Sequence, residues 1–174
     1  MPVNAEIKAR VDDLEVLRRQ VRSLGAVWKG SCVQEDTFFR VPRGRLKLRV
    51  AEESAELIHY EREDREGPKS SHYEVCAISD PEGLRRVLAA NLGVRGCVRK
   101  RRELFLLDRT RIHLDEVEGL GSFLELEVML GEGEAVEDGE RTAVSILRRL
   151  SIAKDALVSG AYIDLLEHGG RRAE

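Results

Sequence analysis

The stretch NAEIKARV, residues 4–11, alternates polar and apolar side chains without a break. Successive side chains of a β-strand point to opposite faces, so this stretch predicts a strand with one charged face and one apolar face. The same alternation recurs in GRLKLRV, residues 44–50, and in FLELEVML, residues 123–130. One face of the resulting sheet therefore needs an apolar cover, while the other face gathers charge.

Two further stretches place charged or titratable side chains at alternate positions. Lys100 is followed by Arg102, and Arg111 is followed by His113 and Asp115. Many cations beside a few carboxylates suit a polyphosphate and its metal ion, because basic groups bind phosphate oxygens and carboxylates bind hard cations. The alternative is an ordinary half-exposed antiparallel sheet whose charged face lies in solvent.

Length and composition favour one folded domain that spans residues 1–174, with a frayed tail at 168–174. Of the 174 residues, 42% are hydrophobic, 35% are charged and 5% are aromatic, which predicts an aliphatic core. The formal net charge of -3 argues against general nucleic-acid binding. The sequence has no apolar run of about 18 residues, and its first residues lack the apolar stretch of a secretory signal. We therefore expect a soluble, cytoplasmic protein without a membrane partner.

Periodicity and turn residues predict about eight strands with helices between and after them. The predicted strands cover residues 3–11, 26–41, 46–50, 56–63, 72–78, 94–108, 110–116 and 122–130. One helix is predicted to begin after Asp13 and a second to cover residues 81–92. Apolar stripes near residues 143–150 and 162–166 predict a third helix and a shorter fourth one. Residues 65–71, with the sequence REGPKSS, are predicted as a surface loop, and so is the acidic stretch at 131–140.

So many antiparallel strands must hide their edges, and closure into a barrel or tunnel does so. If helices cover the apolar face, the charged face points into the lumen, where it needs water or a highly charged ligand. Trp28, Phe38 and Phe39 are predicted to pack in the core. The three cysteines, Cys32, Cys76 and Cys97, are predicted to be reduced and half-buried, because their spacing fits neither a disulfide framework nor a zinc site.

These segments, taken in order, resemble the CYTH family of triphosphate tunnel metalloenzymes, which includes class IV adenylyl cyclases and thiamine triphosphatases. NAEIKARV resembles the ExExK signature of that family. Matching segments follow in the same order: QEDTFF at 34–39, LKLR at 46–49, IHYER at 58–62, VRKRRELF at 98–105, RIHLDEVEGLG at 111–121 and FLELEV at 123–128. The ending SGAYIDLL, at 159–166, resembles the class IV branch. The resemblance implies an α+β fold, an eight-stranded antiparallel closed β-tunnel with helices covering its outer face.

The resemblance also implies roles for individual residues. Mg²⁺ or Mn²⁺ would be held by Glu6, Glu125 and Glu127, with Asp115 near the metal or its waters. The triphosphate would be bound by Lys8, Lys47, Arg49, Arg62, Lys100, Arg102 and Arg111. Glu6, Lys8 and Asp115 are the implied catalytic residues. Arg99 and Arg101 fall on the opposite strand parity and are predicted to be solvated.

Two positions depart from the family pattern. Asn4 stands at the first acidic position of ExExK, and Phe105 stands where the family has a tyrosine. His113 shares strand parity with Asp115, so it is a candidate general base, although a structural role is the more common one for such a histidine.

The implied activity is that of a class IV adenylyl cyclase, a phosphorus–oxygen lyase that converts ATP to cyclic AMP and pyrophosphate. Hydrolysis of tripolyphosphate or thiamine triphosphate in the same tunnel is the alternative. A third interpretation, which Asn4 favours, is a non-catalytic module that binds nucleotide or polyphosphate. The family resemblance also suggests a homodimer.

Overall fold

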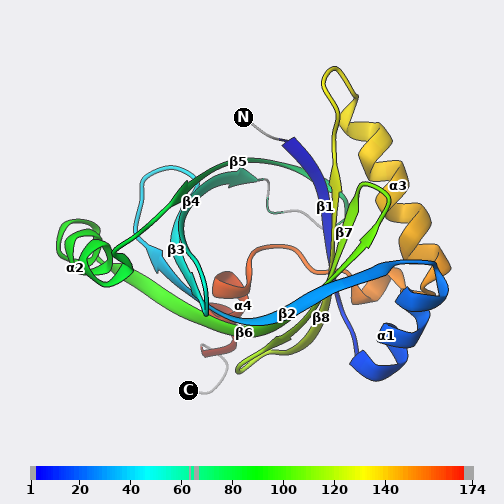
Figure 1. Ribbon diagram of the computed structural model, residues 1–174, viewed down its shortest axis with the longest axis horizontal. Coiled ribbons are helices and arrows are strands. Elements are labelled where there is room, and N and C mark those ends of the chain that lie inside the picture. The colour runs from blue at the N-terminus through cyan, green and yellow to red at the C-terminus, as the bar shows by residue number, and fades with distance from the viewer. Residues whose placement is uncertain (1–2, 63, 65–66, 171–174) are drawn as a thin grey trace.

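The computed structural model describes residues 3–62, 64 and 67–170, and its described part is built mainly from strands (Figure 1). The strands are β1 (Val3–Arg10), β2 (Val27–Phe39), β3 (Arg45–Ala51), β4 (Ala55–Arg62), β5 (Lys69–Ala77), β6 (Val94–Leu107), β7 (Thr110–Val117) and β8 (Gly121–Met129). The helices are α1 (Leu14–Ser23), α2 (Pro81–Leu92), α3 (Val136–Arg149), the short 3₁₀ helix η1 (Lys154–Ala156) and α4 (Tyr162–Gly170).

The strands form a closed antiparallel barrel in the order β1-β5-β4-β3-β2-β6-β7-β8. This confirms the α+β tunnel fold, and the alternative of an open, half-exposed sheet is wrong. In the register of β1 and β8, Glu6 lies opposite Glu127 and Ile7 lies opposite Leu126. Residues directly opposite each other share a face, so the charged residues of both strands point to one side and the apolar residues to the other.

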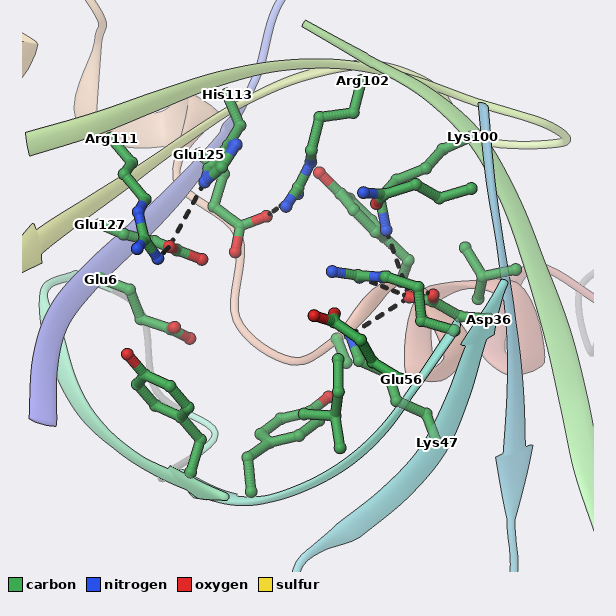
Figure 2. A pocket seen from close by; sticks show the side chains of 18 of the residues that line it. Glu6, Asp36, Lys47, Glu56, Lys100, Arg102, Arg111, His113, Glu125 and Glu127 are labelled. Carbon is green, nitrogen blue, oxygen red and sulfur yellow. Dashed lines mark hydrogen bonds and ion pairs between the residues drawn. The ribbon is translucent and has the colours of Figure 1, made fainter. Parts of the chain in front are cut away.

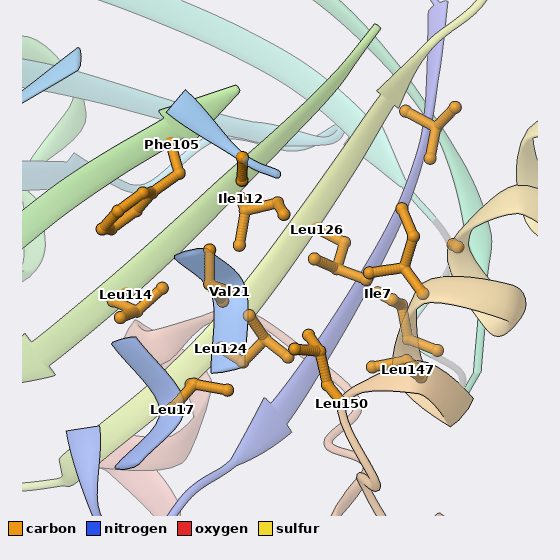
Figure 3. Close-up of a cluster of buried hydrophobic side chains, with 14 of the residues drawn as sticks. Ile7, Leu17, Val21, Phe105, Ile112, Leu114, Leu124, Leu126, Leu147 and Leu150 are labelled. Carbon is orange, nitrogen blue, oxygen red and sulfur yellow. The ribbon is translucent and has the colours of Figure 1, made fainter. Parts of the chain in front are cut away.

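Helices α1 and α3 cover the apolar outer face of one side of the barrel, as the alternating strands require (Figure 3). Leu17 and Val21 of α1, Leu147 of α3 and Leu150, which follows α3, are buried in one cluster with Leu124, Leu126, Ile7 and Ile112 of the strands. Each such aliphatic side chain contributes about 1.5–3 kcal/mol through burial.

The local sequence fixes where α1 begins and ends. The Asp13 carboxylate accepts hydrogen bonds from the backbone N–H groups of Glu15 and Val16, at 2.8 and 3.0 Å, and so caps the first turn. Gly25, with a φ of +88°, ends the helix in the left-handed region. Leu17 and Val21 are four residues apart, so they lie on the same face of the helix, and that face packs on the barrel.

A second apolar cluster lies inside one end of the barrel, beside α4. Ala161, Tyr162 and Ile163 pack against lumen-facing residues that include Phe38 and Val98. Gly96 of β6 permits this approach, since a Cβ there would lie 2.7 Å from Cδ1 of Ile163. The lumen is therefore charged over part of its length and apolar where α4 packs into it, whereas the sequence pattern predicted a charged lumen.

Two segments predicted as loops belong to regular elements. Lys69 and Ser71, within the predicted loop 65–71, lie in β5, where ladder pairing with β1 outweighs the local turn signal of Gly67 and Pro68. Helix α3 begins at Val136, inside the acidic stretch predicted to be a loop. Glutamate and aspartate favour the first turn of a helix, where they face its positive end, and this accounts for the difference.

Several predictions about burial are wrong. Phe38 and Phe39 are buried, but Trp28 is 51% exposed, because a register shift between Trp28 and Gly30 interrupts the strand alternation. Cys76 and Cys97 are exposed, and only Cys32 is partly buried; all three are free thiols. No residue of α2 is fully buried, so its apolar stripe covers the barrel less than those of α1 and α3. His168 and Gly169 of the predicted frayed tail continue α4, and residues 171–174 lie outside the described part.

Candidate functional site

The lumen holds a cavity of about 610 Å³ to which all eight strands and α4 contribute side chains (Figure 2). Basic side chains outnumber acidic ones among the residues that line it. The charges are not mixed evenly. Carboxylates gather on the wall formed by β1 and β8, while several cations gather on the opposite wall, formed by β2, β3 and β6.

Glu6, Glu125 and Glu127 form the acidic wall. One carboxylate oxygen from each lies within 4.8 Å of the others. The register of β1 and β8 explains this proximity, since Glu6 pairs with Glu127 and Lys8 pairs with Glu125. Three partly or fully buried carboxylates at this distance suit Mg²⁺ or Mn²⁺, which prefer hard oxygen ligands.

Asn4 extends the acidic wall by one more oxygen. It is 4% exposed, and its side-chain oxygen has no hydrogen-bond partner among the described residues. A buried oxygen without a partner costs free energy unless a ligand or water satisfies it. The donor set of this wall therefore fits a hydrated divalent cation, even though Asn4 replaces a carboxylate.

The surroundings set the charge of each glutamate differently. Burial raises the pKa of the Glu6 carboxyl, and an ion pair with Arg62 opposes that effect only in part. Burial also raises the pKa of Glu127, but the interaction with His113, whose Nε2 lies 3.3 Å away, reverses this and brings the pKa to about 2. For Glu125, the charges of Lys8 and Arg102 outweigh burial and hold the pKa well below its usual range.

Asp36 of β2 is the centre of the basic wall. Its carboxylate accepts hydrogen bonds from Nε and Nη2 of Arg49, at 2.8 and 2.7 Å. Nζ of Lys47 lies 3.2 Å from the same carboxylate, and Nζ of Lys100 lies 3.3 Å from it. Thus Lys47, Arg49 and Lys100, each predicted to bind phosphate, converge on one acidic residue for which no role was predicted.

Asp115 of β7 is not part of the group of three glutamates whose oxygens lie within 4.8 Å of one another. Its carboxylate accepts hydrogen bonds from Nε and Nη2 of Arg102, at 2.7 and 2.6 Å, and from the Tyr162 hydroxyl, at 2.7 Å. Arg102 also donates to Glu125, at 2.8 Å. The carboxylate is fully buried, so these contacts suit a residue that orients Arg102 better than a metal ligand.

Lys8 and Arg62 flank the acidic wall. Nζ of Lys8 lies 4.0 Å from the centre of the Tyr162 ring, a cation–π contact, and burial lowers the pKa of this lysine. Arg62 pairs with Glu6, while its Nε and Nη2 have no hydrogen-bond partner among the described residues. These buried N–H groups are available to a phosphate oxygen.

Arg111 and His113 of β7 lie beside Glu127. Nη1 of Arg111 is 3.7 Å from the carboxylate, and its side chain is 41% exposed. Nε2 of His113 is 3.3 Å from the same carboxylate, and neither ring nitrogen has a hydrogen-bond partner of good geometry among the described residues. Arg99 and Arg101 are exposed on β6, which agrees with their predicted exclusion from the lumen.

Residues near the lumen that were missed as functional candidates include Asp36, Lys69 and Tyr162. The parity of Gln34 and Asp36 within β2 could have identified Asp36. Lys69 is buried, lies opposite Glu6 in the β1–β5 register, and was hidden by the turn signal before it. Burial and the charge of Arg62 lower the pKa of Lys69 to about 8. Tyr162 enters the lumen from α4, and strand periodicity carries no information about a helix that folds into a barrel.

Comparison with known proteins places these features in context. The sequence profile of the CYTH domain family matches residues 3–162. A protein of Methanocaldococcus jannaschii named "Putative adenylate cyclase MJ0240" is 28% identical, over 94% of this chain and 98% of the relative.

Solved structures share the fold. The PH1012 protein of Pyrococcus horikoshii OT3 superposes with a TM-score of 0.85 at 27% identity, covering 94% of this chain and 99% of that one. The Hippeastrum protein named "Putative adenylyl cyclase HpAC1", described as having a dominant triphosphatase activity, has a TM-score of 0.67 at 16% identity, covering 95% of this chain and 96% of that one. At that identity, the likeness to HpAC1 shows the fold alone. No helix in the described part of the chain is long and apolar enough to cross a membrane.

Proposed function

The chain belongs to the CYTH domain family, and from this premise we propose that its tunnel binds a triphosphate with Mg²⁺ or Mn²⁺ and converts ATP to cyclic AMP and pyrophosphate. The observation that carries the proposal is the pairing of two opposed walls in one cavity, one with three glutamates and one with several cations. A metal–triphosphate complex presents both a cation and an anionic chain, so it complements both walls.

Glu6, Glu125 and Glu127 would hold the divalent ion, which would neutralise charge on the phosphates. Side chains from both sides of the lumen would bind the phosphate oxygens: Lys8, Lys47, Arg49, Arg62, Lys100, Arg102 and Arg111. Asp115 would act through Arg102, whose guanidinium it holds by two hydrogen bonds. Arg suits such contacts because its planar fork can donate two parallel hydrogen bonds.

The reaction is an in-line displacement. The ribose 3′-oxygen attacks the α-phosphorus, its bond to phosphorus forms as the bond from that phosphorus to the α,β-bridging oxygen breaks, and pyrophosphate leaves with the bridging oxygen. The proton of the 3′-hydroxyl passes to a basic group or water in the lumen. Positioning and charge neutralisation supply most of the rate enhancement in such reactions, and the surrounding cations offer both.

Hydrolysis of tripolyphosphate or thiamine triphosphate is the second candidate. The same walls would hold the substrate while water attacks a terminal phosphorus. The description of HpAC1, which shares this fold, as having a dominant triphosphatase activity favours keeping this candidate.

Product analysis distinguishes the candidates. ATP, thiamine triphosphate and tripolyphosphate are incubated separately with the protein and Mg²⁺ or Mn²⁺, and the products are identified. Cyclic AMP with pyrophosphate supports the cyclase, whereas orthophosphate release supports the hydrolase. Tight binding of all three compounds without turnover contradicts both and supports a binding module, the role to which Asn4 pointed.

A further inference from the structure

Asp36 places a negative charge on the wall where the anionic substrate is expected to bind. The residue is 1% exposed and touches Lys47, Arg49 and Lys100 (Figure 2). Its position follows from the topology, since β2 lies between β3 and β6 and therefore faces cations from both neighbours. In the register of β2 and β3, Asp36 lies directly opposite Arg49.

A carboxylate here repels phosphate, so its presence needs a physical reason. One buried and two partly buried cations without a counter-ion would be costly, because each has lost water and the three repel one another. The carboxylate offsets that cost while the tunnel holds no ligand. It also fixes the Arg49 guanidinium by two hydrogen bonds, which leaves other N–H groups of the fork free to meet a second anion.

We propose that Asp36 is a positioning residue that keeps Lys47, Arg49 and Lys100 charged and converged on the lumen, so that the triphosphate meets a preassembled wall of cations. The inference rests on the proposed triphosphate-binding function. It assigns Asp36 no contact with substrate and no metal ligation, since the three glutamates lie on the opposite wall.

The charge of Asp36 affects the pKa values of the two lysines beside it. Burial lowers the pKa of Lys100 to about 7, and Asp36 is the largest influence that opposes this. Burial and the charge of Arg49 lower the pKa of Lys47 to about 8, again against Asp36. The other charged or titratable groups that face these residues are Arg102 of β6, Asp115 of β7, Glu125 of β8, Tyr162 of α4, and Tyr60 and Glu56 of β4.

The direction of the pH effect follows from these positions. A bound triphosphate favours the charged form of each lysine. Affinity is therefore highest at pH values below the pKa that the lysine has in the ligand-free protein, and it falls as the pH rises through that pKa. Removing the Asp36 charge lowers the ligand-free pKa of both lysines further. The fall in affinity must then begin at a lower pH, and above that point each unit of pKa lost costs about tenfold in affinity.

The test measures tripolyphosphate binding by calorimetry between pH 5.5 and 9 for the wild type, Asp36→Asn and Asp36→Glu. We expect Asp36→Asn to bind at least as well as the wild type at the lowest pH, where the lysines are charged and the repulsion from Asp36 is gone, and at least about tenfold more weakly near pH 8. Asp36→Glu restores the charge and should restore the wild-type pH range, even if its longer side chain alters the affinity. Glu35→Gln is the matched control, because Glu35 is the preceding residue of β2 and pairs with Arg85 and Arg99 instead.

Each outcome has a defined meaning. If Asp36→Asn folds and follows the wild-type pH profile, the positioning role is wrong. A purely structural role of Asp36 predicts that the variant binds tripolyphosphate more weakly by the same factor at every pH. The positioning role predicts instead that the fall in affinity begins at a lower pH. If Asp36→Asn fails to fold, Lys100→Gln is added to it, which removes one cation left without a counter-ion. The double variant is then compared with Lys100→Gln alone, and the fall in its affinity should again begin at a lower pH, now because of Lys47.

The two proposals fail separately. If the wild type does not bind tripolyphosphate, the proposed function is wrong. The role of Asp36 can then still be tested by titrating the lysines of the ligand-free protein. For that purpose, NMR of protein labelled at lysine side chains follows the lysine pKa values in the wild type and Asp36→Asn. Unchanged lysine pKa values in the variant overturn the role of Asp36 whatever the tunnel binds.

Discussion

Glu127 is the residue through which the proposed metal site is best tested. It lies opposite Glu6, and its carboxylate contributes to the group of three glutamates. We expect Glu127→Gln to raise the metal concentration needed for half-maximal activity by at least about tenfold, since an amide is a weaker and uncharged ligand for Mg²⁺. A titration of activity with Mg²⁺ and Mn²⁺ measures this change.

Glu116→Gln is the control for that substitution, because Glu116 is exposed on the neighbouring strand β7. Circular dichroism establishes that both variants retain the fold. An unchanged metal requirement in folded Glu127→Gln would remove Glu127 from the site.

Arg49 tests the basic wall. Arg49→Ala removes the fork held by Asp36 and, with it, charge-assisted contacts to phosphate worth about 1.5–3 kcal/mol, or roughly 10- to 150-fold in tripolyphosphate affinity. Orthophosphate binding should weaken much less, because a single phosphate cannot reach every cation of the wall. Calorimetry with both ligands checks this difference, and Arg99→Ala on the outer face is the matched control.

For single residues, strand parity correctly predicted which face of the sheet a side chain is on, but it did not predict which other side chains it contacts. Parity placed Lys47, Arg49, Lys100 and Arg102 in the lumen and excluded Arg99 and Arg101. It did not reveal that Asp36 collects three of these cations, because contact between strands depends on barrel order and register. It also failed at Trp28, where a register shift changes the alternation.

Among the elements, α4 depends on a small polar network for its place at the barrel end. The Asp164 carboxylate accepts hydrogen bonds from Arg45 of β3 and Arg95 of β6, at 2.7 and 2.5 Å. It also accepts the backbone N–H of Ala161, at 2.6 Å. One side chain thus joins α4 to two strands.

Asp164→Asn should therefore lower the free energy of unfolding by about 2 kcal/mol, the scale of lost charge-assisted hydrogen bonds. Although burial raises the pKa of Asp164, the Ala161 N–H and the two arginines hold it below its usual value near 3.8. A depressed pKa stabilises the fold above the unfolded value, and this contribution is lost as the pH falls through the folded value.

Thermal unfolding of the wild type and Asp164→Asn at several pH values tests that prediction. The difference between them should stay constant above about pH 5 and shrink below about pH 4. A difference that grows on acidification would contradict the role of this carboxylate. Asp155→Asn, at an exposed position in η1, is the control.

The elements themselves were predictable wherever apolar periodicity and caps agreed. The strands near residues 3–10 and 121–129 and the helix after Asp13 match their predictions closely. The start of β5 was missed because Gly67 and Pro68 indicate a turn locally, whereas its pairing with β1 depends on residues far away in the sequence. The packing of α4 into the lumen depends likewise on Gly96 and Phe38, which no local pattern connects with it.

For the molecule as a whole, the charged lumen predicts that a ligand stabilises the fold. Bound tripolyphosphate with Mg²⁺ would neutralise both walls at once. At a ligand concentration 100 times the dissociation constant, binding adds about 2.7 kcal/mol, which corresponds to roughly 5–10 °C in melting temperature for a chain of this size.

Melting temperatures measured with tripolyphosphate and Mg²⁺, with orthophosphate and Mg²⁺, and with salt of matched ionic strength provide the comparison. Only the first condition should produce the full increase. Equal increases in all three would indicate general charge screening and would count against a specific ligand.

The position of β1 between β5 and β8 governs how the molecule can be made. Among the eight strands of the barrel, β1 is synthesised first, and its two hydrogen-bonding neighbours, β5 and β8, both come later. The barrel cannot close until β8 has been synthesised, so the edge of β1 that pairs with β8 stays unpaired until then. Pairings between such distant segments slow folding and leave strand edges open to other chains. We therefore expect the newly synthesised chain to aggregate more readily than the completed barrel.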